Sequence, residues 1–342
     1  MKKSIIYLFA SAALLTGCKK DDPFAETCTD CDNDSFLFVS NEGAFGGTGS
    51  VSKINLTKQT VENDLYANAN NSVPVGSVVQ SLSLTDEGGY VVTNGSDQIV
   101  GYNGSDFSHK NAITVSYPRY VASEGDFGYV TSGNYAGKVF KFNLSTGAIV
   151  DSVAVGYGPE QLVILDNKIV VCNSGGWDND STIAIIDKET FEVDSLLEVG
   201  SKPTDILEDK NGDLWILASG RYADTKEPQI VQLNPSDWSI TQSMVIGTAD
   251  QNISKMAINT DKDMLMYYKS EGVFKLGISE TSAPSSPLIS TGGWYGIEAN
   301  ADLFLFEAPD FSSAGKVVQY TINGDSITEY TVGVGPNGGV FN

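Results

Sequence analysis

Aromatic residues in glycine-rich polar loops are the part of this sequence best suited to binding chemistry. Five loops of similar composition each place one aromatic residue among Gly, Asn, Asp and Ser, and these aromatics are Phe45, Tyr135, Trp177, Tyr222 and Phe311. Loop aromatics have no core to fill, so an exposed set of them suggests a binding surface. Rigid rings bury much area at low entropy cost, and short polar neighbours supply hydrogen bonds. The alternative is that the rings pack on adjacent loops and only order them.

The same face of the expected fold receives further candidates from the connections between repeated units. They are Arg119, Tyr120, Tyr157, Trp294 and Tyr295, and Arg221 precedes Tyr222 in one of the five loops. Together with the loop aromatics, these residues form the predicted ligand-binding set.

The inventory of catalytic groups is small. His109 is the only histidine and lies in the polar segment 106–110, where we expect a solvated turn. The sequence has no serine nucleophile elbow and no Cys/His pair. Asp178 and Asp180 could bind calcium, but they lack the spaced ligands of a calcium loop. The sequence therefore predicts no catalytic residue, no metal site and no resident cofactor.

The elements that carry these loops can be derived from residues 119–159. Four runs rich in β-branched or aromatic residues are separated by Gly, Asn and Ser turn signals, and they span 120–122, 128–131, 138–142 and 149–155. Each run is shorter than an ordinary helix, and the breaks suit tight turns. This unit is therefore predicted to be a four-stranded antiparallel meander.

The unit recurs along the chain. A hydrophobic residue followed by glycine closes successive units at Val155, Val199 and Ile246, roughly 44 to 47 residues apart. This period is typical of a β-propeller. Seven units predict an all-β fold over residues 35–342, a seven-bladed β-propeller of four-stranded antiparallel blades. The first unit begins on a second strand at Phe36, so segment 335–342 is expected to supply its inner strand and close the ring.

Residues 1–17 are expected to be a lipoprotein signal peptide. Lys2 and Lys3 precede an apolar run over 5–15, which is too short to span a bilayer as a mature helix. The run ends in Leu-Thr-Gly-Cys18, which resembles a bacterial lipobox, in which the peptide is cut before a cysteine that then carries the lipid. An ordinary secretory signal with an incidental cysteine is the alternative.

Residues 18–34 are expected to form a lipidated polar tether. The Lys-Lys-Asp-Asp run after Cys18 resembles the surface-export signal of Bacteroidetes lipoproteins, which predicts the outer face of the outer membrane. Cys28 and Cys31 are expected to form a local disulfide, since a second cysteine pair for zinc is missing, and Cys172 is expected to be buried. A net charge of −22 without a basic stripe argues against nucleic acid and against anionic membranes as partners, leaving the lipid as the membrane attachment.

The segment from Phe36 to Asn342 resembles the exported YncE-like seven-bladed propellers of Bacteroidetes known as DUF5074. The resemblance rests on 39–43 followed by 49–51, on 90–94, and on Val-Gly-x-x-Pro ends such as 199–203. Some surface lipoproteins of this group capture cobalamin (vitamin B12) and pass it to a TonB-dependent outer-membrane transporter. The resemblance therefore implies a corrinoid as the small-molecule ligand and such a transporter as partner. A propeller enzyme of the lactonase or lyase type and a protein-binding or adhesion scaffold are the competing functions.

Overall fold

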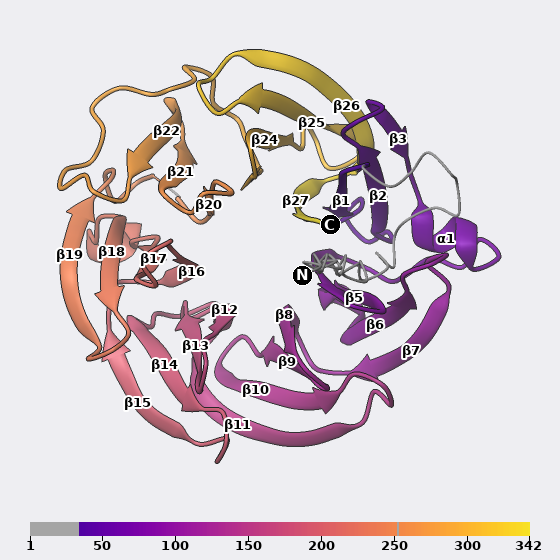
Figure 1. Cartoon of the computed structure of the whole chain (residues 1–342), viewed down its shortest axis with the longest axis horizontal. Coiled ribbons are helices and arrows are strands. Elements are labelled where there is room, and N and C mark those ends of the chain that lie inside the picture. The colour runs from indigo at the N-terminus through magenta and orange to yellow at the C-terminus, as the bar shows by residue number, and fades with distance from the viewer. Residues whose placement is uncertain (1–33, 252) are drawn as a thin grey trace, which may run out of the picture.

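Seven β-sheets surround a central axis in the computed structural model, which describes residues 34–251 and 253–342 (Figure 1). The predicted seven-bladed propeller is therefore confirmed. The predictions for the signal peptide, for Cys18 and for Cys28 and Cys31 lie outside the described residues. No helix in the described ranges is both long and apolar enough to cross a membrane.

Each sheet runs from an inner strand at the axis to the rim. The first three sheets are, in that order, β27 (Pro336–Phe341), β1 (Phe36–Asn41), β2 (Ser50–Asn55) and β3 (Thr60–Glu62); β4 (Val79–Thr85), β5 (Gly88–Thr93), β6 (Gln98–Asn103) and β7 (His109–Thr114); and β8 (Pro118–Glu124), β9 (Phe127–Ser132), β10 (Ala136–Asn143) and β11 (Ile149–Tyr157). The next two are β12 (Pro159–Ile164), β13 (Lys168–Asn173), β14 (Thr182–Asp187) and β15 (Val193–Glu198); and β16 (Pro203–Glu208), β17 (Leu214–Ala218), β18 (Gln229–Asn234) and β19 (Ser239–Val245). The last two are β20 (Met256–Ile258), β21 (Met264–Lys269) and β22 (Gly272–Gly277); and β23 (Gly296–Ala299), β24 (Asp302–Glu307), β25 (Ala314–Thr321) and β26 (Ser326–Val334). Three short helical segments lie in connections, namely α1 (Leu65–Ala69), η1 (Asn94–Ser96) and η2 (Tyr222–Asp224).

The core of the molecule lies between neighbouring blades. The second strand of a blade packs against neighbours on both faces, so β5 and β17 are buried at every position. One apolar cluster, for example, joins Val170 and Ile183 of the fourth blade to Ile216 and Val231 of the fifth. Every blade thus buries two apolar faces only because the ring supplies a neighbour on each side.

The sixth blade differs from the four-strand plan at its rim. Its sheet contains three regular strands, and the outer position is taken by an irregular segment that forms a single bridge between Val273 and Ile289. The intervening sequence contains Pro284 and Pro287 among serines. Proline lacks the N–H that a ladder needs, so a continuous outer strand cannot form there.

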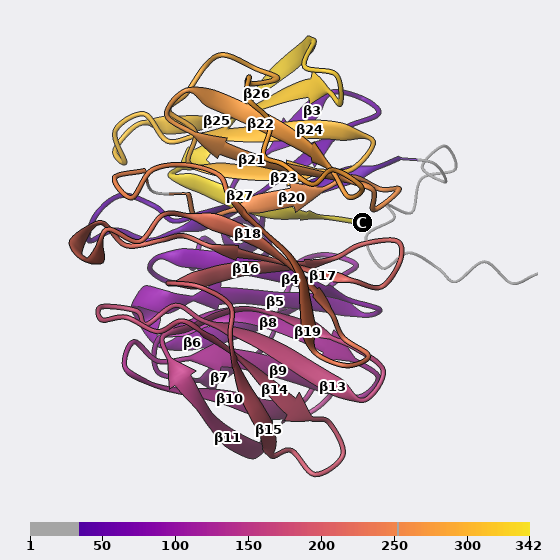
Figure 2. The ribbon, with the colours of Figure 1, turned by 90° about the vertical axis from the view of Figure 1, so that its left-hand side faces the viewer.

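The aromatic loops lie on one face of the disc, and the ends of the described chain lie on the other. β1 ends at Asn41, beside the loops that join second to third strands, and it begins at Phe36 on the opposite face. Asn342 lies at that opposite face too, where its Oδ1 accepts a hydrogen bond of 2.7 Å from the Phe36 N–H. The edge-on view shows this C-terminus on one side of the disc (Figure 2). The first described residues and the C-terminus therefore lie away from the aromatic loops.

Candidate functional site

A cavity of about 900 Å³ occupies the axis on the face that carries the aromatic loops. Inner strands and loops of several blades contribute its lining, which includes Glu42, Gln80, Asn94, Arg119, Tyr120, Glu160, Ser174, Trp177, Lys202, Thr204, Ser219, Lys255, Tyr268, Trp294 and Tyr295. We call this space the mouth cavity. Its volume lies within the range of small-molecule sites, and its lining mixes aromatic rings with polar and charged groups.

Two further cavities continue along the axis. An inner cavity of about 390 Å³ shares Gln80, Tyr120 and Lys255 with the mouth cavity. A third space of about 600 Å³ at the opposite face shares Leu84 and Ser123 with the inner cavity. The three cavities thus follow one another through the ring. We call the three residues shared by the mouth and inner cavities, Gln80, Tyr120 and Lys255, the waist.

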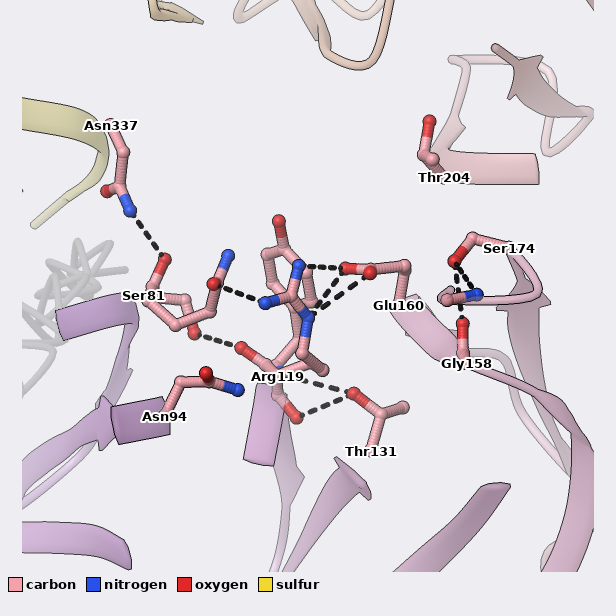
Figure 3. Close-up of polar contacts among 12 residues, drawn as sticks. Ser81, Asn94, Arg119, Thr131, Gly158, Glu160, Ser174, Thr204 and Asn337 are labelled. Carbon is pink, nitrogen blue, oxygen red and sulfur yellow. Dashed lines mark hydrogen bonds and ion pairs between the residues drawn. The ribbon is translucent and has the colours of Figure 1, made fainter. Parts of the chain in front are cut away.

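A proline at the start of an inner strand places a polar side chain at the axis in four blades. The residues directly after Pro118, Pro159, Pro203 and Pro336 are Arg119, Glu160, Thr204 and Asn337. Proline fixes φ near −65° and needs no ladder partner, which suits the first residue of an edge strand. Figure 3 shows the four polar side chains around the axis.

Arg119 and Glu160 form the strongest charged contact in the mouth cavity. Arg119 Nε donates to both Glu160 oxygens, at 3.1 and 3.0 Å, and Nη2 donates to Oε2 at 2.9 Å (Figure 3). Nη1 donates to the Gln80 side-chain oxygen. The two side chains are 24% and 14% exposed, so the bidentate pair is screened little by water. This pair fixes the guanidinium as a rigid wall of the cavity.

Glu42 joins the first blade to the last at the mouth. Its Oε1 accepts hydrogen bonds from the Tyr295 hydroxyl at 2.9 Å and from Asn337 Nδ2 at 3.0 Å. Burial, and then the Glu42 charge, raise the pKa of Tyr295, so its hydroxyl remains a donor at neutral pH. The Tyr295 ring meets Phe311 edge-on at 4.9 Å. The Phe311 ring therefore supports the lining from behind.

Three ionisable groups in this part of the ring have charged forms that burial disfavours: Lys255 and Glu298, which line the inner cavity, and Asp205, which is buried outside the cavity lining. Burial raises the pKa of Glu298 to about 8 and that of Asp205 to about 6, and it lowers the pKa of Lys255. Asp205 accepts backbone hydrogen bonds of 2.9 Å from Met256 and from Ile206. Perturbed groups that line a cavity are characteristic of functional sites.

Close backbone packing orders the loop that carries Trp177. Gly158 has φ +51°, and a Cβ there would lie 2.1 Å from the Gly176 nitrogen, so only glycine fits. Lys202 Nζ donates to the Gly176 carbonyl at 3.1 Å and to the Asp178 carbonyl at 3.0 Å. Trp177 itself is 76% exposed at the rim of the cavity. Its loop is thus held firmly while its indole stays free for a ligand.

Five of the eleven residues of the predicted ligand-binding set line the mouth cavity: Arg119, Tyr120, Trp177, Trp294 and Tyr295. Arg119 was expected in a connection between blades, but it belongs to β8, because Pro118 already starts the strand; Tyr120 lies in β8 as the predicted strand run 120–122 requires. Trp294 Nε1 donates to the Thr291 carbonyl at 2.6 Å. The structure therefore brings together residues from the third, fourth and seventh parts of the ring.

The other six members of the set do not line that cavity. Phe45, Tyr135, Tyr157 and Tyr222 are exposed, and Phe311 contacts Tyr295 as described. Arg221 pairs with Asp224 at 2.7 Å. Of the three aromatic residues in the loops of the third, fourth and fifth blades, Trp177 lines the mouth cavity, whereas Tyr135 and Tyr222 do not.

The remaining candidate groups have structural partners. His109 opens β7 instead of lying in a turn, and its Nδ1 is 2.8 Å from the Tyr66 hydroxyl. Asp180 accepts hydrogen bonds from the backbone of Tyr157, Ser181 and Thr182. These bonds explain Asp180 as a residue that orders its loop. Cys172 is buried in β13, as expected.

Sequence reasoning missed Glu42, Lys202, Lys255, Glu298 and Asn337. These residues come from distant parts of the chain. Glu42 and Lys202 lie within segments 39–43 and 199–203, which were interpreted as markers of the fold and not as parts of a site. The proline that precedes Asn337, like those before Arg119, Glu160 and Thr204, is a signal that could have identified part of the lining. Lys255 and Glu298 lack any such signal.

Comparison with known sequences identifies one family. The family model described as a domain of unknown function, DUF5074, matches residues 36–326. No curated protein sequence matches the chain.

Several solved structures share the fold at low identity. A quinoprotein alcohol dehydrogenase-like protein from Bacteroides thetaiotaomicron is 13% identical, with a TM-score of 0.64 over 88% of this chain and 76% of that one. The periplasmic gluconolactonase of Pseudomonas aeruginosa is 11% identical, with a TM-score of 0.65 over 90% of this chain and 99% of that one. BamB from Moraxella catarrhalis is 13% identical, with a TM-score of 0.52 over 86% and 81%. At such identities the likeness establishes the propeller fold alone.

Proposed function

The chain belongs to the DUF5074 family, and on that premise we propose that it is a surface lipoprotein that captures a small-molecule ligand in the mouth cavity. The first candidate ligand is a corrinoid such as cobalamin, delivered onward to a TonB-dependent outer-membrane transporter. This choice is motivated by the motifs shared with the exported propellers of this group, some members of which capture cobalamin.

The observation that carries the proposal is the composition of the mouth cavity. Trp177, Trp294 and Tyr295 offer aromatic faces around an opening of about 900 Å³. Lys202 and Ser219 also line this opening and carry N–H and O–H donors. A corrinoid is a large, flat ring with amide groups at its edge, so it suits aromatic contact across its face and hydrogen bonds at its rim.

The position of the chain ends supports the proposed orientation. The chain enters the ring at Phe36, on the face opposite the mouth cavity. A lipid on Cys18 would therefore attach the domain by its far face and leave the mouth open to the outside. Capture of a ligand before its transfer requires this kind of access.

Co-migration of cyanocobalamin with the protein on a sizing column tests the proposal. The soluble domain, residues 35–342, should carry the red ligand in its peak. Bovine serum albumin at equal concentration controls for non-specific adsorption. Cyanocobalamin that elutes only at the volume of the free ligand, and not with the protein peak, would rule out corrinoid capture.

Hydrolysis of a lactone is the second candidate function. It is favoured by Glu298 and Lys255, whose carboxyl and amine line the axis and have pKa values shifted toward neutrality. The fold shared with a periplasmic gluconolactonase makes glucono-δ-lactone the substrate to assay. A rate above the uncatalysed background that Lys255→Met abolishes would favour this function over capture.

A further inference from the structure

Lys255 is a buried amine with few partners. Its Nζ lies at the waist, between the mouth cavity and the inner cavity, and donates to the Asn337 carbonyl. No carboxylate within the described ranges lies in ion-pairing distance of this nitrogen. A lysine side chain has more than one N–H donor in either protonation state, so Lys255 retains unused donor capacity toward the cavities. Burial without an adjacent anion disfavours its charged form and lowers its pKa, and an anionic group bound beside it would favour the charged form.

Glu298 supplies a second donor to the same space. Its carboxyl accepts a hydrogen bond of 3.2 Å from the Gly339 N–H. Because its pKa is raised to about 8 by burial, the group is mainly protonated at neutral pH and carries an O–H. It therefore adds no negative charge beside Lys255 at that pH.

Gly338 leaves the space between these two groups open. A Cβ at Gly338 would lie 3.2 Å from Glu298 Oε1 and 3.7 Å from Lys255 Nζ. Both groups therefore lie close to the same point on the Gly338 backbone, and all three residues line the inner cavity. Because glycine has no side chain to fill this corner of the cavity, a ligand oxygen that enters the cavity can approach both the Lys255 amine and the Glu298 carboxyl.

Other carboxylates near the waist already have donors. Glu160 is held by Arg119, and Glu42 accepts from Tyr295 and Asn337. Asp205 accepts from two backbone N–H groups. None of these three carboxylates depends on Lys255 for a hydrogen bond, so the remaining donor capacity of Lys255 is open to a ligand in the inner cavity. Ser83, which also lines this cavity, has a buried hydroxyl without a partner among the described residues.

We propose that the space beside Gly338 is an oxyanion subsite, in which Lys255 Nζ and the Glu298 carboxyl donate to a carboxylate or phosphate group of a small ligand. The inner cavity of about 390 Å³ is large enough for such a group, and the mouth cavity gives access to it. This subsite is separate from the aromatic rim at Trp177. It does not depend on corrinoid binding, because small anions alone are expected to occupy it.

Lysine-resolved NMR measures this binding directly. Biosynthetic labelling of the propeller domain, residues 35–342, with ¹³C-lysine leaves the amine and its donors unaltered, and Lys255→Met assigns the Lys255 Cε signal. Titration with inorganic phosphate and, separately, with acetate should shift the Lys255 signal saturably, while the exposed Lys226 shows no saturable shift. A response to phosphate alone assigns the subsite to phosphorylated ligands, and a response to acetate alone assigns it to carboxylates. No saturable shift with either anion overturns the proposal.

Substitution separates binding from a structural role. Lys255→Met should weaken the responding anion, measured by calorimetry, by about tenfold or more, the usual effect of losing a charged hydrogen bond. Glu298→Gln retains a neutral donor, so it should change affinity at pH 7 by less than about threefold. Equal affinity in wild type and a folded Lys255→Met protein would also overturn the proposal.

The pH dependence of anion affinity provides an independent test of the role of Glu298. Four charged groups act electrostatically on Lys255: the carboxylates of Glu298, Glu42 and Asp205 raise its pKa, and the guanidinium of Arg119 lowers it. Above about pH 8 Glu298 ionises and repels the anion, so wild-type affinity should fall by roughly tenfold per unit there. Glu298→Gln should lose affinity less steeply, since only the deprotonation of Lys255 remains. Identical profiles in both proteins would exclude Glu298 from the subsite.

Discussion

Val340, near the C-terminus, lies directly opposite Phe38, in the first strand of the described chain. The antiparallel ladder between β27 and β1 also pairs Leu37 with Phe341 and Val39 with Gly339. This pairing closes the ring with backbone hydrogen bonds and covers the inner edge of β1, which would otherwise be open. It also brings Asn337 to the axis beside Glu42 and Ser40. Closure and construction of the site therefore use the same eight-residue segment, 335–342.

Deletion of residues 335–342 should destabilise the propeller severely. The change removes β27 and exposes the inner edge of β1, whose six residues are all buried. We expect the melting temperature to fall by more than about 8 °C, since ~1 kcal/mol corresponds to about 2 to 4 °C at large domain size. Thermal melts followed by circular dichroism give the answer. A truncated protein that melts within about 2 °C of the full chain would contradict closure by the C-terminal strand.

Asn337→Ala should cost about 2 to 4 kcal/mol of unfolding free energy. The Asn337 amide donates to the carbonyls of Val79 and Gln80, both at 3.1 Å, and to Glu42, and it accepts from the Ser40 hydroxyl. Its removal leaves several buried polar groups without a partner, each worth about 1 to 3 kcal/mol. Urea unfolding measures the loss. Asn94→Ala, which removes one hydrogen bond at the rim, is the matched control and should cost less than half as much.

The blades could be predicted from the sequence, whereas most of the axis could not. Strand runs such as 138–142 and the recurring Val-Gly ends at 155 and 199 are local signals, so the repeat and its closure were derived correctly. The site is assembled from blades far apart in the chain. In the sequence, Lys255 and Glu298 therefore resemble ordinary surface charges, and only the closed ring brings them together in the lining of the inner cavity. An exposed aromatic side chain in an equivalent loop is also not enough to predict a cavity residue, because Trp177 lines the mouth cavity and the equally exposed Tyr222 does not.

Glu298→Gln should change how stability depends on pH. Burial raises the pKa of Glu298 from an ordinary 4.5 to about 8, so between these values the folded state binds a proton that the unfolded state does not. Wild-type stability therefore declines as pH rises through this window, and the loss is complete above about pH 8. Gln removes the titration. We expect the variant to melt above wild type near pH 8 and the gap to shrink toward pH 5; a gap independent of pH would contradict the buried neutral carboxyl.

Cys18→Ala should release the protein from the membrane fraction. Cys18 lies outside the described residues, and acylation there is the membrane attachment that the sequence predicts. Fractionation followed by immunoblotting measures the release. Replacement of residues 19–22 by Ala should instead keep the protein in the membrane but remove its accessibility to protease on intact cells. Unchanged accessibility would reject the surface-export signal.

Cyanocobalamin affinity of Trp177→Ala, compared with Tyr222→Ala, tests the central claim most directly. Both side chains are about equally exposed, at 76% and 75%, on equivalent loops, but only Trp177 lines the mouth cavity. Calorimetric titration should show that Trp177→Ala weakens binding by about 30-fold, or roughly 2 kcal/mol, while Tyr222→Ala binds as wild type does. Melting temperatures of both variants should stay within about 2 °C of wild type, because neither ring packs in a blade core. A Trp177→Ala protein that binds the corrinoid with wild-type affinity would contradict capture at the mouth cavity.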